Sequence, residues 1–225
     1  MFTPLTREQI ARRIAQDIPD GAYVNIGIGL PELVANELSR HEPGNAREII
    51  LQSENGILGM GPAPVAGAED MELINAGKKP VTLVQGGAFF HHADSFAMMR
   101  GGHIDIAILG AFQVSAGGDL ANWTLGKKGV APAVGGAMDL AVGARRVFVI
   151  MEHTSKDGSP KIVDQCTLPL TGIAAVSRIY TDLAVIERTA LGMVVTAMVA
   201  GLSFDELQAK TGAKLQFPAA PELLN

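Results

Sequence analysis

A strand–helix–strand pattern near the amino terminus constrains the fold more than any other feature of this sequence. Residues 23–28 alternate apolar and polar side chains as a strand does, and Pro31 then opens a segment with helical spacing. A second apolar run, Ile49–Gln52, follows. Two strands joined through a helix are normally parallel neighbours in one sheet. The sequence therefore predicts an α/β fold, with a mainly parallel open sheet flanked by helices.

The remaining pattern extends this arrangement over the whole chain. Capping boxes at Thr6–Gln9 and Ser203–Glu206 predict helices near both ends, the second ending at Gly212. Neither a repeat nor a linker is visible, so we expect one domain over residues 1–225. Two further helices are predicted, Asp94–Arg100 and Ala137–Val142. The other predicted strands are Val81–Val84, Ile104–Leu109, Val147–Met151, Lys161–Val163, Thr181–Ile186 and Met193–Val199. Turns are predicted at 41–46 and 154–159, and long loops at Ala63–Lys79, over the site, and at Gly110–Gly136.

Composition excludes several classes of function. Of the 225 residues 48% are hydrophobic and 18% are charged, which leaves ample material for a core. The net charge of −5 argues against non-specific nucleic-acid binding. The charged start of the chain does not resemble a signal peptide, and no apolar stretch reaches the roughly 20 residues that a membrane span needs. We expect a soluble, cytoplasmic protein.

The single cysteine, Cys166, allows no intrachain disulfide and fits a reducing compartment. A buried, inert thiol is favoured there over a nucleophile. The histidines do not predict a metal site: His91 and His92 are adjacent, and His103 with Asp94 completes no standard ligand spacing. We expect neither a bound metal nor a tightly bound cofactor.

Glu54 is the residue that most suggests chemistry. It stands where the run Ile49–Gln52 stops, within the sequence SENGILGMGP (Ser53–Pro62). The carboxyl end of a strand in an open α/β sheet is where ligands bind, and glycines allow another group to approach the backbone. The same pattern also fits a solvated glutamate on a surface turn. A carboxylate, already ionised at pH 7, can act as a nucleophile without a base once it is removed from water.

The glycines do not form a recognisable nucleotide loop. Gly27-x-Gly29 lacks the third glycine of the dinucleotide fingerprint, and no Walker lysine follows Gly56–Gly61. Acyl transfer through an anhydride is the chemistry that suits an isolated carboxylate nucleophile.

Six blocks, in order along the chain, resemble the β subunits of family I 3-oxoacid CoA-transferases. Besides Ser53–Pro62 they are LINAGK (73–78), DSFAMMRGGHIDI (94–106), GDLANW (118–123), GGAMDL (135–140) and PLTG (169–172). Residues 86–96 and 172–185 are more similar to the type that acts on 3-oxoadipate than to the type that acts on acetoacetate. Residues 124–134 differ from the acetoacetate type, so no CoA contacts are transferred to that stretch.

The resemblance implies a ping-pong reaction with coenzyme A as a substrate. Glu54 would attack succinyl-CoA, the CoA thiolate would attack the resulting anhydride, and the glutamyl-CoA thioester would pass its CoA to the acceptor acid. The backbone N–H of Gly136 would help to stabilise the oxyanions. A second donor would come from the A subunit of the transferase, and the usual assembly is α2β2.

The family also implies binding roles. Asn25 and Lys78 would lie near the CoA chain, although a solvated Lys78 remains an alternative. Asn55 and Asn122 would position groups around Glu54.

The residues that would bind the far carboxylate of 3-oxoadipate are a separate hypothesis. Arg100, His91 or His92 could pair with it, while Arg100 could instead interact with the carboxyl end of its own helix. The sequence leaves two alternatives open: acetoacetate as the acceptor, and a non-catalytic binding module on the same fold.

Overall fold

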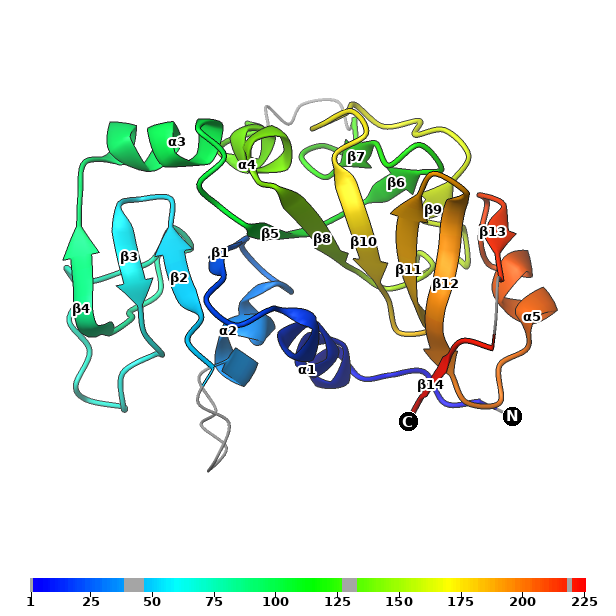
Figure 1. The fold of residues 1–225 in the computed structure, drawn as a ribbon, viewed down its shortest axis with the longest axis horizontal. Coiled ribbons are helices and arrows are strands. Elements are labelled where there is room, and N and C mark those ends of the chain that lie inside the picture. Colours follow the sequence, from blue (N-terminus) through cyan, green and yellow to red (C-terminus); the bar gives the residue numbers. More distant parts are fainter. Residues whose placement is uncertain (1, 39–46, 127–132, 218–219) are drawn as a thin grey trace.

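The computed structural model describes residues 2–38, 47–126, 133–217 and 220–225; the predicted turn at 41–46 lies outside them. Its main element is an eleven-stranded sheet in the order β13-β12-β11-β10-β8-β5-β1-β2-β3-β4, with β14 beside β12 (Figure 1). The helices are α1 (Arg7–Asp17), α2 (Glu32–Leu38), α3 (His92–Arg100), α4 (Ala137–Gly143) and α5 (Phe204–Ala209). The strands are β1 (Tyr23–Ile26), β2 (Ile50–Ser53), β3 (Ile57–Met60), β4 (Leu83–Phe89), β5 (Ile106–Gly110), β6 (Gln113–Ser115), β7 (Leu120–Ala121), β8 (Arg146–Ile150), β9 (Ile162–Val163), β10 (Val176–Tyr180), β11 (Ala184–Thr189), β12 (Gly192–Val199), β13 (Leu215–Gln216) and β14 (Glu222–Leu224).

The predicted parallel sheet is confirmed at the centre of the molecule. Strands β2, β1, β5, β8 and β10 are parallel to one another. The margins are antiparallel: β3 and β4 extend one side, and β11 and β12 extend the other. The strands β6, β7 and β9 form a separate small sheet.

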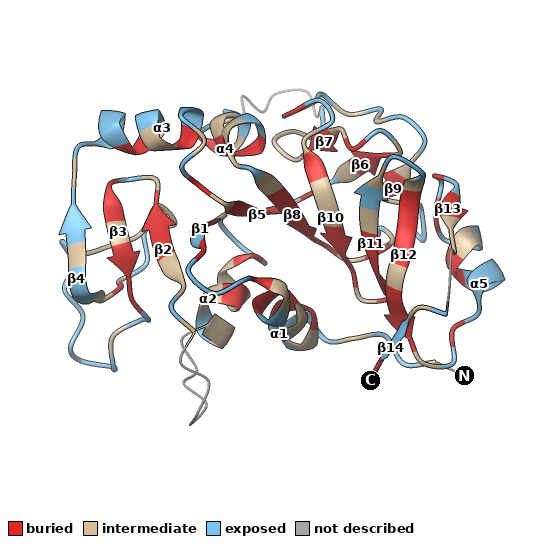
Figure 2. Ribbon diagram, viewed as in Figure 1, coloured by how far each residue is buried: buried red, intermediate tan, exposed pale blue. Residues whose placement is uncertain are grey.

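Both faces of the parallel strands are buried, which explains their continuous apolar runs. Successive side chains of a strand point to opposite faces. In β5, Ile106 and Ile108 belong to the core that includes α1 and α2, whereas Ala107 and Leu109 belong to the core that includes α3 and α4. The central strands are accordingly buried, while β4 at the free edge is largely exposed (Figure 2).

The order of the strands fixes where a ligand can enter. Strands β1 and β5 are neighbours, and the connections that leave them run in opposite directions across the sheet: β1 leads to β2, whereas β5 leads to β8. At such a switch point the loops beyond the carboxyl ends separate and leave a crevice. The candidate site lies there.

Local signals located the helices well. The capping boxes of Thr6 and Ser203 are both formed, and α3 and α4 lie where they were predicted. Helix α2 begins at Glu32, one residue later than predicted, and α5 ends at Ala209. The C-cap residue of α5 is Lys210, so this helix ends before the predicted Gly212.

The strands were predicted less completely. The strands β3 and β10 were missed, β4 continues beyond Val84 to Phe89, and residues 110–136 contain β6 and β7. The glycines of SENGILGMGP belong to the β2–β3 hairpin and to β3 and its end. A methyl group on Gly56 would lie 2.3 Å from the Phe90 oxygen, and one on Gly61 would lie 2.4 Å from Thr82 Oγ1. The group that approaches these glycines closely is therefore the neighbouring chain segment and not a ligand.

Gly56 offers a test of this packing. Its φ is +114°, and its oxygen accepts a hydrogen bond of 3.0 Å from the Phe90 N–H. Gly67 also has a positive φ, +87°, but a methyl group added there would meet no atom within 4 Å. We expect Gly56→Ala to lower the free energy of unfolding by at least about 1 kcal/mol more than Gly67→Ala does. Both variants place an alanine at a positive φ, but only the methyl group at position 56 would clash with a neighbouring atom. Denaturant unfolding measures the difference, and equal losses would contradict the packing argument.

Candidate active site

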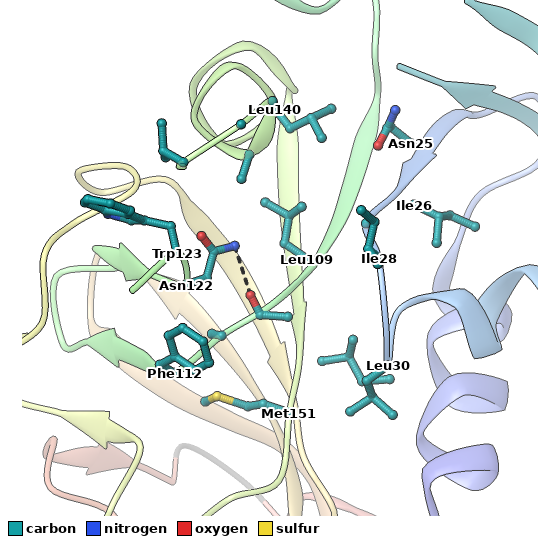
Figure 3. A pocket seen from close by; sticks show the side chains of 18 of the residues that line it. Asn25, Ile26, Ile28, Leu30, Leu109, Phe112, Asn122, Trp123, Leu140 and Met151 are labelled. Atoms are coloured by element: carbon teal, nitrogen blue, oxygen red, sulfur yellow. Dashed lines mark hydrogen bonds between the residues drawn. The ribbon is translucent and has the colours of Figure 1, made fainter. Parts of the chain in front are cut away.

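A cleft of about 650 Å³ opens at the switch point (Figure 3). Its walls come from the carboxyl ends of β1, β5 and β8 and from the start of α4. Asn25 and Leu140 lie at one end of the view, and Leu30 and Met151 lie at the other. Asn122 and Trp123 reach the cleft from the segment that follows β7. Residues that are distant in the sequence therefore surround one cavity.

Glu54 lies in this cleft, directly against Gly136. It follows β2 in the turn to β3, and Gly136 is the N-cap residue of α4. A methyl group on Gly136 would lie 2.4 Å from Glu54 Oε2 and 3.1 Å from Oε1. Only a glycine leaves room for the carboxylate at this position. The two residues expected to take part in the chemistry, far apart in the sequence, are thus in contact.

The surroundings of Glu54 favour its neutral form. Burial raises the pKa of Glu54 above its ordinary value, the charge of His92 opposes this shift, and Asp139 on α4 adds to it. Removal from water is also what makes an ionised carboxylate a better nucleophile. The Gly136 N–H has no hydrogen-bond partner among the described residues, so it can donate to an oxygen in the cleft.

Asn25 belongs to a buried polar chain beneath the cleft. Its amide nitrogen donates to Gln52 Oε1 at 2.5 Å, and Gln52 in turn donates to Ser95 Oγ at 2.6 Å. All three side chains are buried. The side-chain oxygen of Asn25 accepts no hydrogen bond from any described residue, and Asn25 lines the cleft. Gln52 was not singled out in the sequence, although it lies in the strand that leads to Glu54.

Two other predicted asparagines are engaged within the protein. Asn122 lines the cleft, but its amide donates to the Gly110 oxygen and its oxygen accepts from Thr171 Oγ1. Asn55 lies outside the cleft lining and donates to the Ile74 oxygen at 2.7 Å. Asn55 therefore ties the predicted excursion over residues 63–79 to the turn that carries Glu54.

Lys78 does not line the cleft. It is exposed in the tight turn 75–79, where its φ is +62°. The neighbouring Ala76 reaches the cleft, and Lys79 pairs with Glu32 on α2 at 2.5 Å. The turn thus lies at the rim of the site, while the role predicted for Lys78 itself stays a prediction.

The three residues predicted to meet the far carboxylate also lie outside the lining of the cleft. His91 is the N-cap of α3 and accepts from the Ala93 N–H. His92 packs on the Phe96 ring with the centroids 4.6 Å apart. Arg100 pairs with Asp139 at 2.6 Å and so joins α3 to α4. The partner of Arg100 is therefore another helix, which is neither of the two alternatives that the sequence suggested.

Three charged residues of the cleft were not predicted from the sequence: Arg7, Glu152 and Lys161. Arg7 and Glu152 form an ion pair of 2.5 Å. The next residue, His153, has a structural role. It is buried between Thr181 and Thr211, and burial lowers its pKa to about 4. Glu152 instead faces the cleft, as the position after a parallel strand would have indicated.

Other chemistry finds little support in the described residues. Burial raises the pKa of the Cys166 thiol to about 11, and this thiol lies outside the cleft lining, as expected for an inert cysteine. Within the described ranges no group of three or more histidine, cysteine, aspartate or glutamate residues is arranged to hold a metal ion. No helix in the same part of the chain is both long enough and apolar enough to cross a bilayer.

Known proteins with similar sequences identify the family. A profile of the coenzyme A transferases matches residues 7–210. The chain belongs to the coenzyme A transferase family. It is 63% identical over 211 residues to the B subunit of the 3-oxoadipate CoA-transferase of Pseudomonas putida, covering 94% of this chain and 96% of the relative. The corresponding protein of Acinetobacter baylyi is 59% identical over 95% of this chain and 96% of its own length. The B subunit of the succinyl-CoA:3-ketoacid coenzyme A transferase of Helicobacter pylori is 50% identical over 93% of this chain and 98% of its own length.

Solved structures agree on the fold of this transferase chain. An acyl-CoA transferase of Escherichia coli O157:H7 matches with a TM-score of 0.74 at 18% identity, over all of this chain and 45% of the longer one. Glutaconate coenzyme A-transferase of Acidaminococcus fermentans matches with a TM-score of 0.71 at 17% identity, over 100% of this chain and 91% of that one. The predicted α/β fold class is confirmed by these neighbours.

Replacement of Glu54 by glutamine tests, through the thermal stability of the protein, whether the surroundings of Glu54 disfavour its ionised form. The native state binds the proton of a carboxyl group with a raised pKa more readily than the unfolded chain does, so ionised Glu54 destabilises the fold at neutral pH. We expect Glu54→Gln to raise the midpoint of thermal unfolding at pH 7. The gain should shrink as the pH falls through the native pKa and vanish below the unfolded value of about 4.3.

The exposed Glu72→Gln, which makes the same change in charge, is the matched control and should leave the midpoint nearly unchanged. A lower midpoint for Glu54→Gln at pH 7 would mean that the ionised carboxylate stabilises the chain.

Proposed function

We propose that this chain is the B subunit of a 3-oxoadipate CoA-transferase, which moves CoA from succinyl-CoA to 3-oxoadipate in the bacterial breakdown of aromatic compounds. The observation that carries the catalytic part is the contact of the Glu54 carboxylate with Gly136 inside the cleft. A carboxylate nucleophile and a free backbone N–H donor at one point are what acyl exchange requires.

The reaction proceeds in two symmetric halves. Glu54 attacks the thioester carbon of succinyl-CoA, and the oxyanion that forms accepts a hydrogen bond from the Gly136 N–H. The carbon–sulfur bond breaks, giving a succinyl-glutamyl anhydride and CoA thiolate. The thiolate then attacks the glutamyl carbonyl and releases succinate, so that CoA is held as a thioester on Glu54. The carboxylate of 3-oxoadipate repeats these steps in reverse order and leaves as 3-oxoadipyl-CoA.

The energy of the thioester must stay within the exchange. A glutamyl anhydride or thioester exposed to water would be hydrolysed, so the site must exclude solvent during both halves. Apolar groups that line the cleft, among them Leu109 and Leu140, suit this purpose. Coenzyme A is thus a substrate and not a resident cofactor. We infer that Asn25, with its free oxygen, contacts the bound acyl-CoA.

The acceptor is proposed from the relatives. Two relatives named for 3-oxoadipate are 63% and 59% identical to this chain, whereas a relative named for 3-ketoacids is 50% identical. Acetoacetate, the acceptor implied by the second type, is the alternative.

The assembly is also proposed from the relatives. Because they are named as B subunits, we infer a partner A subunit, which would supply a second oxyanion donor, and an α2β2 assembly. We propose a cytoplasmic location, where succinyl-CoA and a reduced Cys166 would be found.

Intact mass spectrometry tests this proposal directly. The chain, mixed with succinyl-CoA and its A subunit in the absence of an acceptor, should gain the mass of one CoA. The adduct should be removed by hydroxylamine and should not form with Glu54→Ala. Discharge by 3-oxoadipate rather than acetoacetate would establish the acceptor. A folded, associated complex that forms no adduct would exclude Glu54 as a covalent catalyst and reopen the binding-module alternative.

Gly136→Ala should damage the same step without removing the nucleophile. The added methyl group would lie 2.4 Å from Glu54 Oε2, so the carboxylate must move. A displacement of about 1 Å in an active site can cost about 10²-fold in rate. We therefore expect adduct formation to slow by about that factor, measured by quenched-flow mass spectrometry. Gly136 has a φ of −73°, so its replacement adds no backbone strain, and Gly117→Ala, where φ is also not positive and the nearest atom to an added methyl group is 3.6 Å away, is the matched control. Equal rates for both variants would contradict the proposed contact.

A further inference from the structure

The cleft extends well beyond Glu54, and its other end is charged. Glu54 follows β2, whereas Met151 and Glu152 follow β8, three strands away in the sheet. At about 4.8 Å between neighbouring strands, this spans roughly 14 Å between the two strand ends. The reacting groups occupy one end only, so the remainder of the cleft is available to the rest of a substrate.

Lys161 places a cation at that far end. Its backbone is held beside β6, where its oxygen accepts from the Val114 N–H at 2.9 Å, and it immediately precedes β9. Its side chain is partly buried and lines the cleft. Burial lowers the pKa of Lys161, and the charges of Glu152 and Asp182 oppose that shift. It makes no ion pair with any other described residue, whereas the neighbouring Glu152 is paired with Arg7 at 2.5 Å. A half-buried ammonium without a partner is costly unless a ligand supplies one.

The middle of the cleft is apolar. Leu109 lies midway along it, and Phe112, Leu30 and Met151 follow toward the far end (Figure 3). A ligand that fits has a reactive carboxyl group at one end, a short aliphatic body and an anionic group at the other end. Two acidic groups, Glu152 and Asp182, are close enough to Lys161 to influence it. This favours a singly charged carboxylate over a phosphate, which would carry more charge into the same place.

We propose that Lys161 binds the distal carboxylate of a short dicarboxylic acid whose other carboxyl group reacts at Glu54. This inference rests on the proposed function and deepens it, because it assigns the residue that distinguishes 3-oxoadipate from a monocarboxylic 3-oxo acid. Lys161 takes the place of Arg100, His91 and His92 as the candidate for this role, since none of those three lines the cleft.

The test separates acid recognition from catalysis. The complex with the A subunit is first loaded with CoA by succinyl-CoA until the adduct is complete by mass. Its discharge is then timed with 3-oxoadipate and with 3-oxohexanoate, which has the same chain length but a methyl group in place of the distal carboxylate. Lys161→Met, of similar length and uncharged, should slow discharge by 3-oxoadipate at least about tenfold, the loss expected for one charge-assisted hydrogen bond. Discharge by 3-oxohexanoate should change less than about twofold.

Two further variants complete the experiment. Lys161→Arg retains the charge and should recover part of the preference for 3-oxoadipate. Lys214→Met removes an exposed lysine away from the cleft and should change neither rate. The inference is overturned if the wild-type complex discharges both acids equally, or if Lys161→Met slows both to the same extent. A wild-type complex that never forms the adduct overturns the proposed function and the inference with it, whereas a normal adduct with unchanged acid preference in Lys161→Met overturns the inference alone.

Discussion

The close contact between the Glu54 carboxylate and the backbone of Gly136 is the constraint around which this site is built. It requires β2 to end beside the start of α4, although the two segments are far apart in the chain. The parallel sheet achieves this, because the carboxyl ends of β2, β1, β5 and β8 share one edge and α4 leads into β8. Any side chain at position 136 would displace the carboxylate, so the glycine follows from geometry rather than from flexibility.

Burial of the carboxylate links stability to chemistry. The same removal from water that raises the pKa of Glu54 strips it of the solvation that would make it a weak nucleophile. His92 and Asp139 act on it with opposite signs, and Asp139 is itself paired with Arg100. The helices α3 and α4 therefore adjust the charge around Glu54 while their apolar faces cover the sheet. The same two helices therefore contribute both to the packing of the core and to the reactivity of the site.

The residues at the two ends of the cleft have different roles in the proposed reaction. In the proposed reaction Glu54 and Gly136 face the reacting carbon, while Lys161 and the Arg7–Glu152 pair lie at the end of the cleft beyond β8. An enzyme that exchanges CoA between two acids gains specificity when the part of the acid that does not react is also recognised. The arrangement gives a physical basis for choosing a dicarboxylic acceptor.

Local patterns in the sequence were sufficient to predict the capped helices, most of the apolar strands, the fold class and the position of Glu54 at a strand end. These depend on neighbouring residues, through capping at Thr6 and Ser203 or through alternation of side chains. Three features became visible only in the folded protein: the glycines after Glu54 form a hairpin, Arg100 pairs with Asp139, and Lys161 reaches the cleft. Most of these contacts join segments distant in the chain, and their partners are set by strand order, which local patterns do not encode.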